Sequence, residues 1–270
     1  MRSKTLQSVF LVVFVCVGFA HSQTSEKVDP YRVGENLTFV AKYKPIGLAF
    51  TVGDFDFRVL RAPNGKDYFI RSLAKSRGAL VKLFSFRFLQ RFESTVDSTG
   101  LRILSTVKRD EQGKRVRDSR AEFDYVENKV TWVETDPNDQ TRPPKRVAST
   151  IVPGTQDIVT AVYMLRQMPL AVGKRFVLKV SDSGLIYNIP IDITKREKRK
   201  SILGKKWCFK IEPDIFGDGK FIEQKGKFAF WITDDAARIP VFAKLGTRFG
   251  SVHIKLKKMN NLANDAALKN

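Results

Sequence analysis

Two adjacent carboxylates, Asp234 and Asp235, are followed closely by Arg238 and Pro240. A carboxylate pair can hydrolyse a glycosidic bond when the two groups flank a cleft at roughly 5 to 9 Å. Adjacent residues of one strand instead point to opposite faces, and aspartates readily make turns by accepting hydrogen bonds from backbone amides. Because alternating apolar stretches flank these four residues, we interpret them as a structural turn, with Arg238 paired to one of the acids.

The sequence contains few histidine and cysteine residues that could act in catalysis or bind a metal. Beyond residue 22, His253 is the only histidine and Cys208 the only cysteine. An intramolecular disulfide is therefore excluded, and so is a zinc site of cysteine and histidine, which needs three or four ligands. We predict that His253 is a half-exposed strand residue and that Cys208 is a small buried side chain. No phosphate loop or nucleotide fingerprint is present, so we predict no catalytic residue, metal or cofactor.

The first 22 residues have the pattern of a secretory signal peptide. Arg2 and Lys4 precede an apolar run over 9–19, and small residues follow at Ala20 and Ser22. A membrane anchor is the alternative, but the run is shorter than the roughly 20 residues that a span requires. We expect an exported, periplasmic protein and leave open a peripheral association with the outer membrane.

The net charge is strongly positive. Removing residues 1–22 takes away two cations and no acid, which lowers the formal charge from +20 to +18. Such a charge favours anionic partners, namely lipid headgroups or acidic polymers, and export argues against nucleic acid. The alternative is that the excess charge is solvated surface that aids solubility.

Strand signals dominate the remainder. Alternating stretches separated by turns such as 62–65 predict roughly a dozen strands. One helix is predicted after Pro153, with Thr155 as its N-cap and Asp157 in its first turn, and a shorter helix over 78–84. We therefore predict a mainly β protein, a large curved antiparallel sheet (half-barrel or open barrel-like) with one principal helix and one short helix. The expected organisation is a signal peptide (1–22), a single β-rich domain (23–258), and a polar C-terminal tail (259–270), in a monomer.

Several segments together resemble a bacterial family known as domain of unknown function 3108. The matching segments are YRVGENLTF at 31–39, residues 157–166 with MPL at 168–170 and Gly173, WITDD at 231–235, RIPV at 238–241 and GSV at 250–252. The stretch 160–163 departs from the pattern, because a small serine-containing pair is expected there. The resemblance implies export and a β-rich domain. It implies no activity and supplies no catalytic residue.

Two features could bind a partner. Phe84, Phe86, Phe88 and Phe92 would share one strand face, which either lines a concave surface for an acyl chain or packs as ordinary core against the helix. A predicted hairpin would gather cations that either contact an anionic surface or are solvated. These cations are Lys195, Arg196, Lys198, Arg199, Lys200, Lys205 and Lys206.

Three functions follow from these features. The first is a non-enzymatic protein that binds an envelope lipid or a lipidated partner in an aromatic-lined concavity. The second is a scaffold that binds anionic polymer or lipid headgroups through its basic face. The third is an envelope enzyme that uses carboxylates such as Asp234, Asp235 or Glu223. We expect the protein not to be an enzyme.

Overall fold

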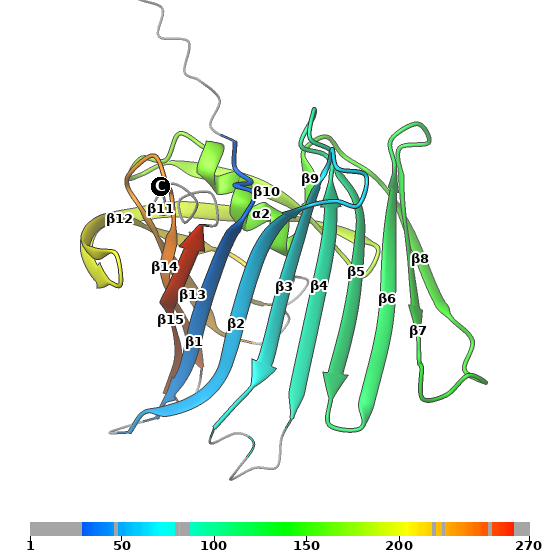
Figure 1. Cartoon of the computed structure of the whole chain (residues 1–270), viewed down its shortest axis with the longest axis horizontal. Helices are drawn as coiled ribbons and strands as arrows, with labels where there is room; N and C mark the ends of the chain where they lie inside the picture. The colour runs from blue at the N-terminus through cyan, green and yellow to red at the C-terminus, as the bar shows by residue number, and fades with distance from the viewer. Residues whose placement is uncertain are drawn as a thin grey trace, which may run out of the picture.

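The computed structural model describes residues 29–45, 48–78, 81, 87–217, 220–222, 225–247 and 250–261. Within these ranges the chain forms one sheet of 15 strands in the order β8-β7-β6-β5-β4-β3-β2-β1-β15-β14-β13-β12-β11-β10-β9 (Figure 1). The strands are β1 (Glu35–Lys44), β2 (Phe50–Arg61), β3 (Tyr68–Ser76), β4 (Phe88–Val96), β5 (Ile103–Gln112), β6 (Arg115–Asp124), β7 (Lys129–Thr135), β8 (Lys145–Thr150), β9 (Thr155–Asp157), β10 (Arg175–Asp182), β11 (Leu185–Ser201), β12 (Gly204–Pro213), β13 (Lys227–Thr233), β14 (Pro240–Thr247) and β15 (Gly250–Asn261).

The sheet is an antiparallel meander whose first and last strands meet in its middle. β1 pairs with both β2 and β15, so the two ends of the domain are hydrogen-bonded to each other. Only the short β9 runs parallel to its neighbour, β10, among the described strands. The predicted fold class, a large curved antiparallel sheet that stays open, is confirmed. The last strand continues to Asn261, beyond the expected start of the tail at residue 259.

The two edges of the sheet approach each other without forming a ladder. The Ser149 hydroxyl on β8 donates a hydrogen bond to the Gly184 carbonyl in the β10–β11 turn at 2.7 Å. A Cβ atom on Gly184, which has a φ of +79°, would lie 2.8 Å from the Val147 Cβ atom, so only glycine allows this approach. Lys108 on β5 and Asp182 on β10 form an ion pair at 3.8 Å across the same gap. Side chains and one glycine turn therefore bring the edges together.

The helix α2 (Ile158–Met164), followed by the 3-10 turn η1 (Leu165–Gln167), packs inside the curved sheet near one end of its strands (Figure 1). Its residues Ala161 and Leu165 join an apolar cluster with strands β10 to β13. Val159 and Tyr163 join a second cluster with β2 to β4. The helix thus fills part of the concavity and connects the two halves of the sheet.

The prediction that Thr155 is the N-cap of the helix is wrong. Residues Thr155–Asp157 form β9, and Asp157 caps α2 instead by accepting hydrogen bonds from the Val159 and Thr160 amides. Threonine and aspartate are both good N-caps, so local propensity does not decide between them. Pairing of Thr155 with Lys179 of β10 decides it, since this pairing holds Thr155 in a strand. The short helix predicted over 78–84 lies largely outside the described residues.

Candidate binding cavity

The turn between β13 and β14 contains the two adjacent carboxylates. Asp235 accepts hydrogen bonds from the Thr233 hydroxyl (2.8 Å) and from the Ala237 and Arg238 amides (3.1 and 3.3 Å). Burial alone would raise the pKa of Asp235, but these hydrogen bonds outweigh it and lower the pKa. Asp234 accepts from Arg196 at 2.6 Å and from Arg238 at 3.4 Å. Asp235 is occupied by the turn, and Asp234 is occupied by Arg196 of β11 and Arg238 of the turn. β14 then starts at Pro240.

The basic residues of the β11–β12 hairpin are partly neutralised. Lys206 lies 3.6 Å from Asp235, and Arg199 lies 3.5 Å from Glu197. With the Arg196–Asp234 pair, three of the seven predicted anion-contacting residues have carboxylate partners. Arg196 also stacks over Trp207 at 4.3 Å. The four remaining exposed cations of the hairpin are Lys195, Lys198, Lys200 and Lys205.

The predicted phenylalanine face is only partly described. Phe84 and Phe86 lie outside the described residues. Phe92 is 8% exposed and packs in the core with Val159 and Tyr163 of the helix. Phe88 begins β4. Neither Phe88 nor Phe92 lines the large cavity of the structure.

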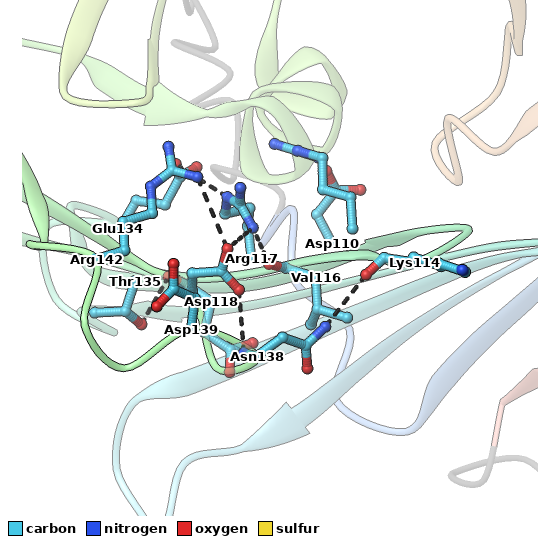
Figure 2. A network of polar contacts seen from close by, with 12 residues as sticks. Asp110, Lys114, Val116, Arg117, Asp118, Glu134, Thr135, Asn138, Asp139 and Arg142 are labelled. Carbon is cyan, nitrogen blue, oxygen red and sulfur yellow. Dashed lines mark hydrogen bonds and ion pairs between the residues drawn. The ribbon is translucent and has the colours of Figure 1, made fainter.

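A network of arginines and carboxylates lies at the β6–β7 side of the sheet, and its groups satisfy one another. Arg117 donates to Asp136 at 2.5 Å and lies 3.8 Å from Glu134 (Figure 2). Arg142 lies 3.7 Å from the same Asp136 carboxylate. Each carboxylate here has a cationic partner, as expected for a network that fixes the loop after β7.

The cavity has a volume of ≈ 540 Å³ and lies between α2, the middle of β10 and the neighbouring loops. Its walls are largely aliphatic and thioether side chains. The lining residues are Gly100, Leu101, Arg102, Tyr125, Asn128, Ile151, Pro153, Gly154, Thr155, Gln156, Ala161, Met164, Met168, Val177, Leu178 and Lys179. Cavities of about 300 to 1,000 Å³ with apolar walls and a few polar groups are typical of small-molecule sites.

Gln156 supplies a polar group that has no partner. Its side chain is 6% exposed, and its amide nitrogen donates to the Leu101 carbonyl at 3.0 Å. Its buried amide oxygen accepts no hydrogen bond. An unsatisfied buried acceptor costs about 1 to 3 kcal/mol. Because neighbouring atoms cover this oxygen, it would have to turn into the cavity before a ligand could donate a hydrogen bond to it.

Two cations and a tyrosine border the aliphatic walls. Arg102 stacks over the Tyr125 ring at 4.8 Å and lies 3.6 Å from Asp97. Burial raises the pKa of Tyr125 to about 12, and its hydroxyl donates to the Ile103 carbonyl at 2.9 Å. Lys179 donates to the Pro153 carbonyl at 3.0 Å. The cavity therefore combines an apolar interior with positive charge at its border.

The amino-acid sequence did not predict this cavity. Leu101, Ile151 and Met164 have the composition of an ordinary core, because a pocket wall and a core are equally apolar. Gln156 offered no signal either, since the partners of its side chain, such as the Leu101 carbonyl, are distant in the sequence. Tertiary packing alone brings these residues together.

Two of the segments that carry the family resemblance meet next to the helix. Arg166 makes two hydrogen bonds to the Glu35 carboxylate, at 2.8 and 3.1 Å, and one to the Pro30 carbonyl at 3.0 Å. Glu35 and Arg166 are 1% and 4% exposed. These residues hold the helix, and with it one wall of the cavity, against the start of β1.

Cys208 is fully buried, and burial raises the pKa of its thiol to about 11. Because the thiolate is the reactive form, we expect Cys208 to resist iodoacetamide at neutral pH in the folded protein. Alkylation should become fast in denaturant. Peptide mass spectrometry after timed alkylation checks this and separates Cys208 from Cys16. Equal rates with and without denaturant would contradict the expectation.

Neither a metal centre nor a membrane-spanning helix is found in the part of the chain that the structure describes. No group of three histidine, cysteine or acidic residues there could hold a metal ion. None of its helices has the length and apolarity of a transmembrane span.

The sequence model of the DUF3108 family, described as a protein of unknown function, matches residues 38–257. No curated protein matches the chain. Among solved structures, a β-barrel-like DUF1849 protein from Brucella abortus is similar over 86% of this chain and 98% of its own, with 12% identity and a TM-score of 0.57. A candidate exported protein with a YmcC-like fold, from Bacteroides fragilis, aligns over 86% of this chain and 97% of its own, with 10% identity and a TM-score of 0.31.

Proposed function

Since this chain belongs to the DUF3108 family, whose description assigns no activity, we propose its function from the cavity: it is an exported, non-enzymatic protein that binds an amphiphile. The apolar chain of the ligand occupies the ≈ 540 Å³ cavity beside α2. Its polar end lies near Gln156 and the border cations Arg102 and Lys179. An envelope lipid or a lipidated partner has this chemistry.

The observation that carries the proposal is a large apolar cavity with one unsatisfied buried acceptor. Burial of an acyl chain against Leu101, Met164 and Leu178 gains roughly 25 cal/mol for each Å² of apolar surface removed from water. The ligand's hydroxyl or amide would satisfy the Gln156 oxygen once that side chain turns its oxygen into the cavity. Arg102 and Lys179 would favour an anionic or strongly polar head group. The binding surface proposed here is aliphatic. The aromatic face expected from the sequence stays a prediction, because Phe84 and Phe86 lie outside the described residues.

An enzyme that uses carboxylates has less support. Asp234 and Asp235 are engaged by the β13–β14 turn, and Glu223 lies outside the described residues. Glu134 and Asp136 of the β6–β7 network each have an arginine partner. None of these groups lines the cavity.

A tryptophan at Val177 tests the proposal. Val177 lines the cavity and is 53% exposed, so the larger ring can cover the opening without disturbing the core. Val172 is equally exposed at 53% but does not line the cavity, which makes Val172→Trp the matched control. We expect Val177→Trp to weaken binding of a fluorescent fatty acid by about tenfold or more, and Val172→Trp to leave it unchanged.

Native mass spectrometry of the protein purified from its own cells, with solvent extraction, identifies the natural ligand. A lipid of defined mass that is lost in Val177→Trp supports the proposal. Two results together would overturn it: a ligand-free spectrum, and fatty-acid binding that is the same in both tryptophan variants.

A further inference from the structure

A second cluster of cations lies on β1, β14 and β15, on the face opposite the buried core. The register places Lys42 and Lys244 directly across from His253, on either side of it, and Val40 and Phe242 across from Lys255. Residues two apart on a strand share a face, so Lys44 joins the same group. Ala41 and Leu256, which point the other way, are 2% and 3% exposed.

A sixth residue reaches this cluster from the long hairpin. The end of β11 contacts β15, and Arg199 of β11 stacks over the rings of Trp231 and Phe242 at 4.2 and 4.4 Å. Stacking between two rings fixes the guanidinium, which reduces the entropy lost when it binds a ligand. Phe242 also packs edge-on against the His253 ring at 5.4 Å.

The cluster has a large uncompensated charge. Within the described residues, Lys42, Lys44, Lys244 and Lys255 form no ion pair. Among the neighbouring carboxylates, Glu197 lies 3.5 Å from Arg199 and offsets the charge of that residue alone, while it also accepts from the Trp231 indole at 2.7 Å. Asp54 pairs with Arg77 at 2.9 Å. Like charges gathered on one face of a sheet repel one another, so this arrangement favours a bound counter-ion.

The pKa values of two residues in the cluster are lowered in part by the positive charges around them. Burial, followed by the charges of Lys44, Lys244, Lys255 and Arg199, lowers the pKa of His253. Burial, followed by the charges of Lys44, Lys257, Arg199 and Lys42, lowers the pKa of Lys255. Both residues therefore hold a proton less readily than an isolated side chain would, and an anion in the cluster would reverse this effect.

We propose that Lys42, Lys44, Lys244, His253, Lys255 and Arg199 form a binding site for a phosphoryl anion. Several convergent cations and a preorganised arginine are the groups that recognise phosphate oxygens. β1 ends at Lys44, and Figure 1 shows this end of β1 at the end of the sheet away from α2. The site is therefore separate from the amphiphile cavity and does not depend on it. The phosphoryl group is either a free phosphate ester or the head group of a lipid.

The test combines a histidine titration with vesicle binding. The NMR signals of His253 are assigned in the full chain by their loss in His253→Asn, which separates them from those of His21. We expect inorganic phosphate, at constant ionic strength, to shift the pKa of His253 upward. Binding to a lipid head group is measured by sedimentation with phosphatidylcholine vesicles, with and without phosphatidylglycerol.

The double variant Lys244→Gln and Lys255→Gln removes two cations of the site. The matched control, Lys114→Gln and Lys129→Gln, removes two exposed lysines elsewhere and gives the same net charge. We expect the site variant to lose the phosphate-induced shift and to bind anionic vesicles roughly tenfold more weakly or worse, since each lysine contributes about 1 kcal/mol at such a surface. The control should behave as the unmodified protein.

A histidine shift with phosphate alone supports the site and indicates a soluble phosphate ester. Vesicle binding that depends on Lys244 and Lys255, without a shift in phosphate, supports the site and indicates a lipid head group. Equal loss of binding in the site variant and its control would overturn the proposal in favour of diffuse net charge. Binding only to a sulfated polymer would also overturn it.

Discussion

Replacing Arg166 with methionine is expected to lower the free energy of unfolding by about 3 to 5 kcal/mol, because it leaves the Glu35 carboxylate buried without a partner. The side chains of Arg166 and Glu35 are 1% and 0% exposed, and they form two hydrogen bonds with each other. Methionine restores neither these bonds nor the one to the Pro30 carbonyl. Urea unfolding, followed by circular dichroism, measures the change.

Two controls separate burial from simple charge pairing. The double variant Glu35→Leu and Arg166→Met should recover much of the loss, since it removes both buried charges together. Arg175→Met breaks an ion pair with Asp192 whose arginine side chain is 69% exposed, and it should cost about 1 kcal/mol or less. An Arg166→Met protein as stable as the Arg175→Met protein would contradict the prediction.

Replacing Asp157 with alanine is expected to cost about 3 kcal/mol or more, because one buried side chain supports both the helix and the sheet. Its first carboxylate oxygen accepts from the Val159 and Thr160 amides at 2.9 and 2.7 Å. Its second oxygen accepts from the Ser94 and Thr106 hydroxyls of β4 and β5. Alanine removes the N-cap and leaves two buried hydroxyls without an acceptor. Thermal or urea unfolding measures the loss.

Asp139→Ala is the control for Asp157→Ala. Asp139 accepts hydrogen bonds only within its own exposed turn, from the Thr141 amide and hydroxyl. Its loss should leave the stability unchanged within experimental error. A similar loss in both variants would mean that the contacts of Asp157 with Ser94 and Thr106 contribute nothing.

Both predictions bear on the binding site. Asp157 fixes the start of α2, and Arg166 fixes the turn that follows it, so together they position Ala161 and Met164 in the cavity wall. Variants that remain folded but loosen the helix should also bind the amphiphile less tightly. None of the six residues of the anion cluster lies in α2 or lines the cavity, so the phosphate response should survive in such variants.

The sequence by itself determined the fold class, the family and the placement of several hairpins. Alternation of apolar and polar residues has a period of two only in strands, and turn residues such as Asn64-Gly65 separate those strands locally. The β11–β12 hairpin formed as predicted, because Ser201 and Gly204 close a short turn between alternating arms. These features depend on neighbours within a few residues of each other.

The tertiary structure alone decided which residues form sites. Asp157 is the N-cap because β10 holds Thr155 in a strand. Arg166 donates a hydrogen bond to Glu35, which lies 131 positions away in the sequence. The cavity depends on loops that meet only when the edges of the sheet approach. The cations of β1, β14 and β15 gather around His253 only because the first and last strands pair. Contacts between distant segments depend on sheet order and register across the whole domain, which local periodicity does not specify.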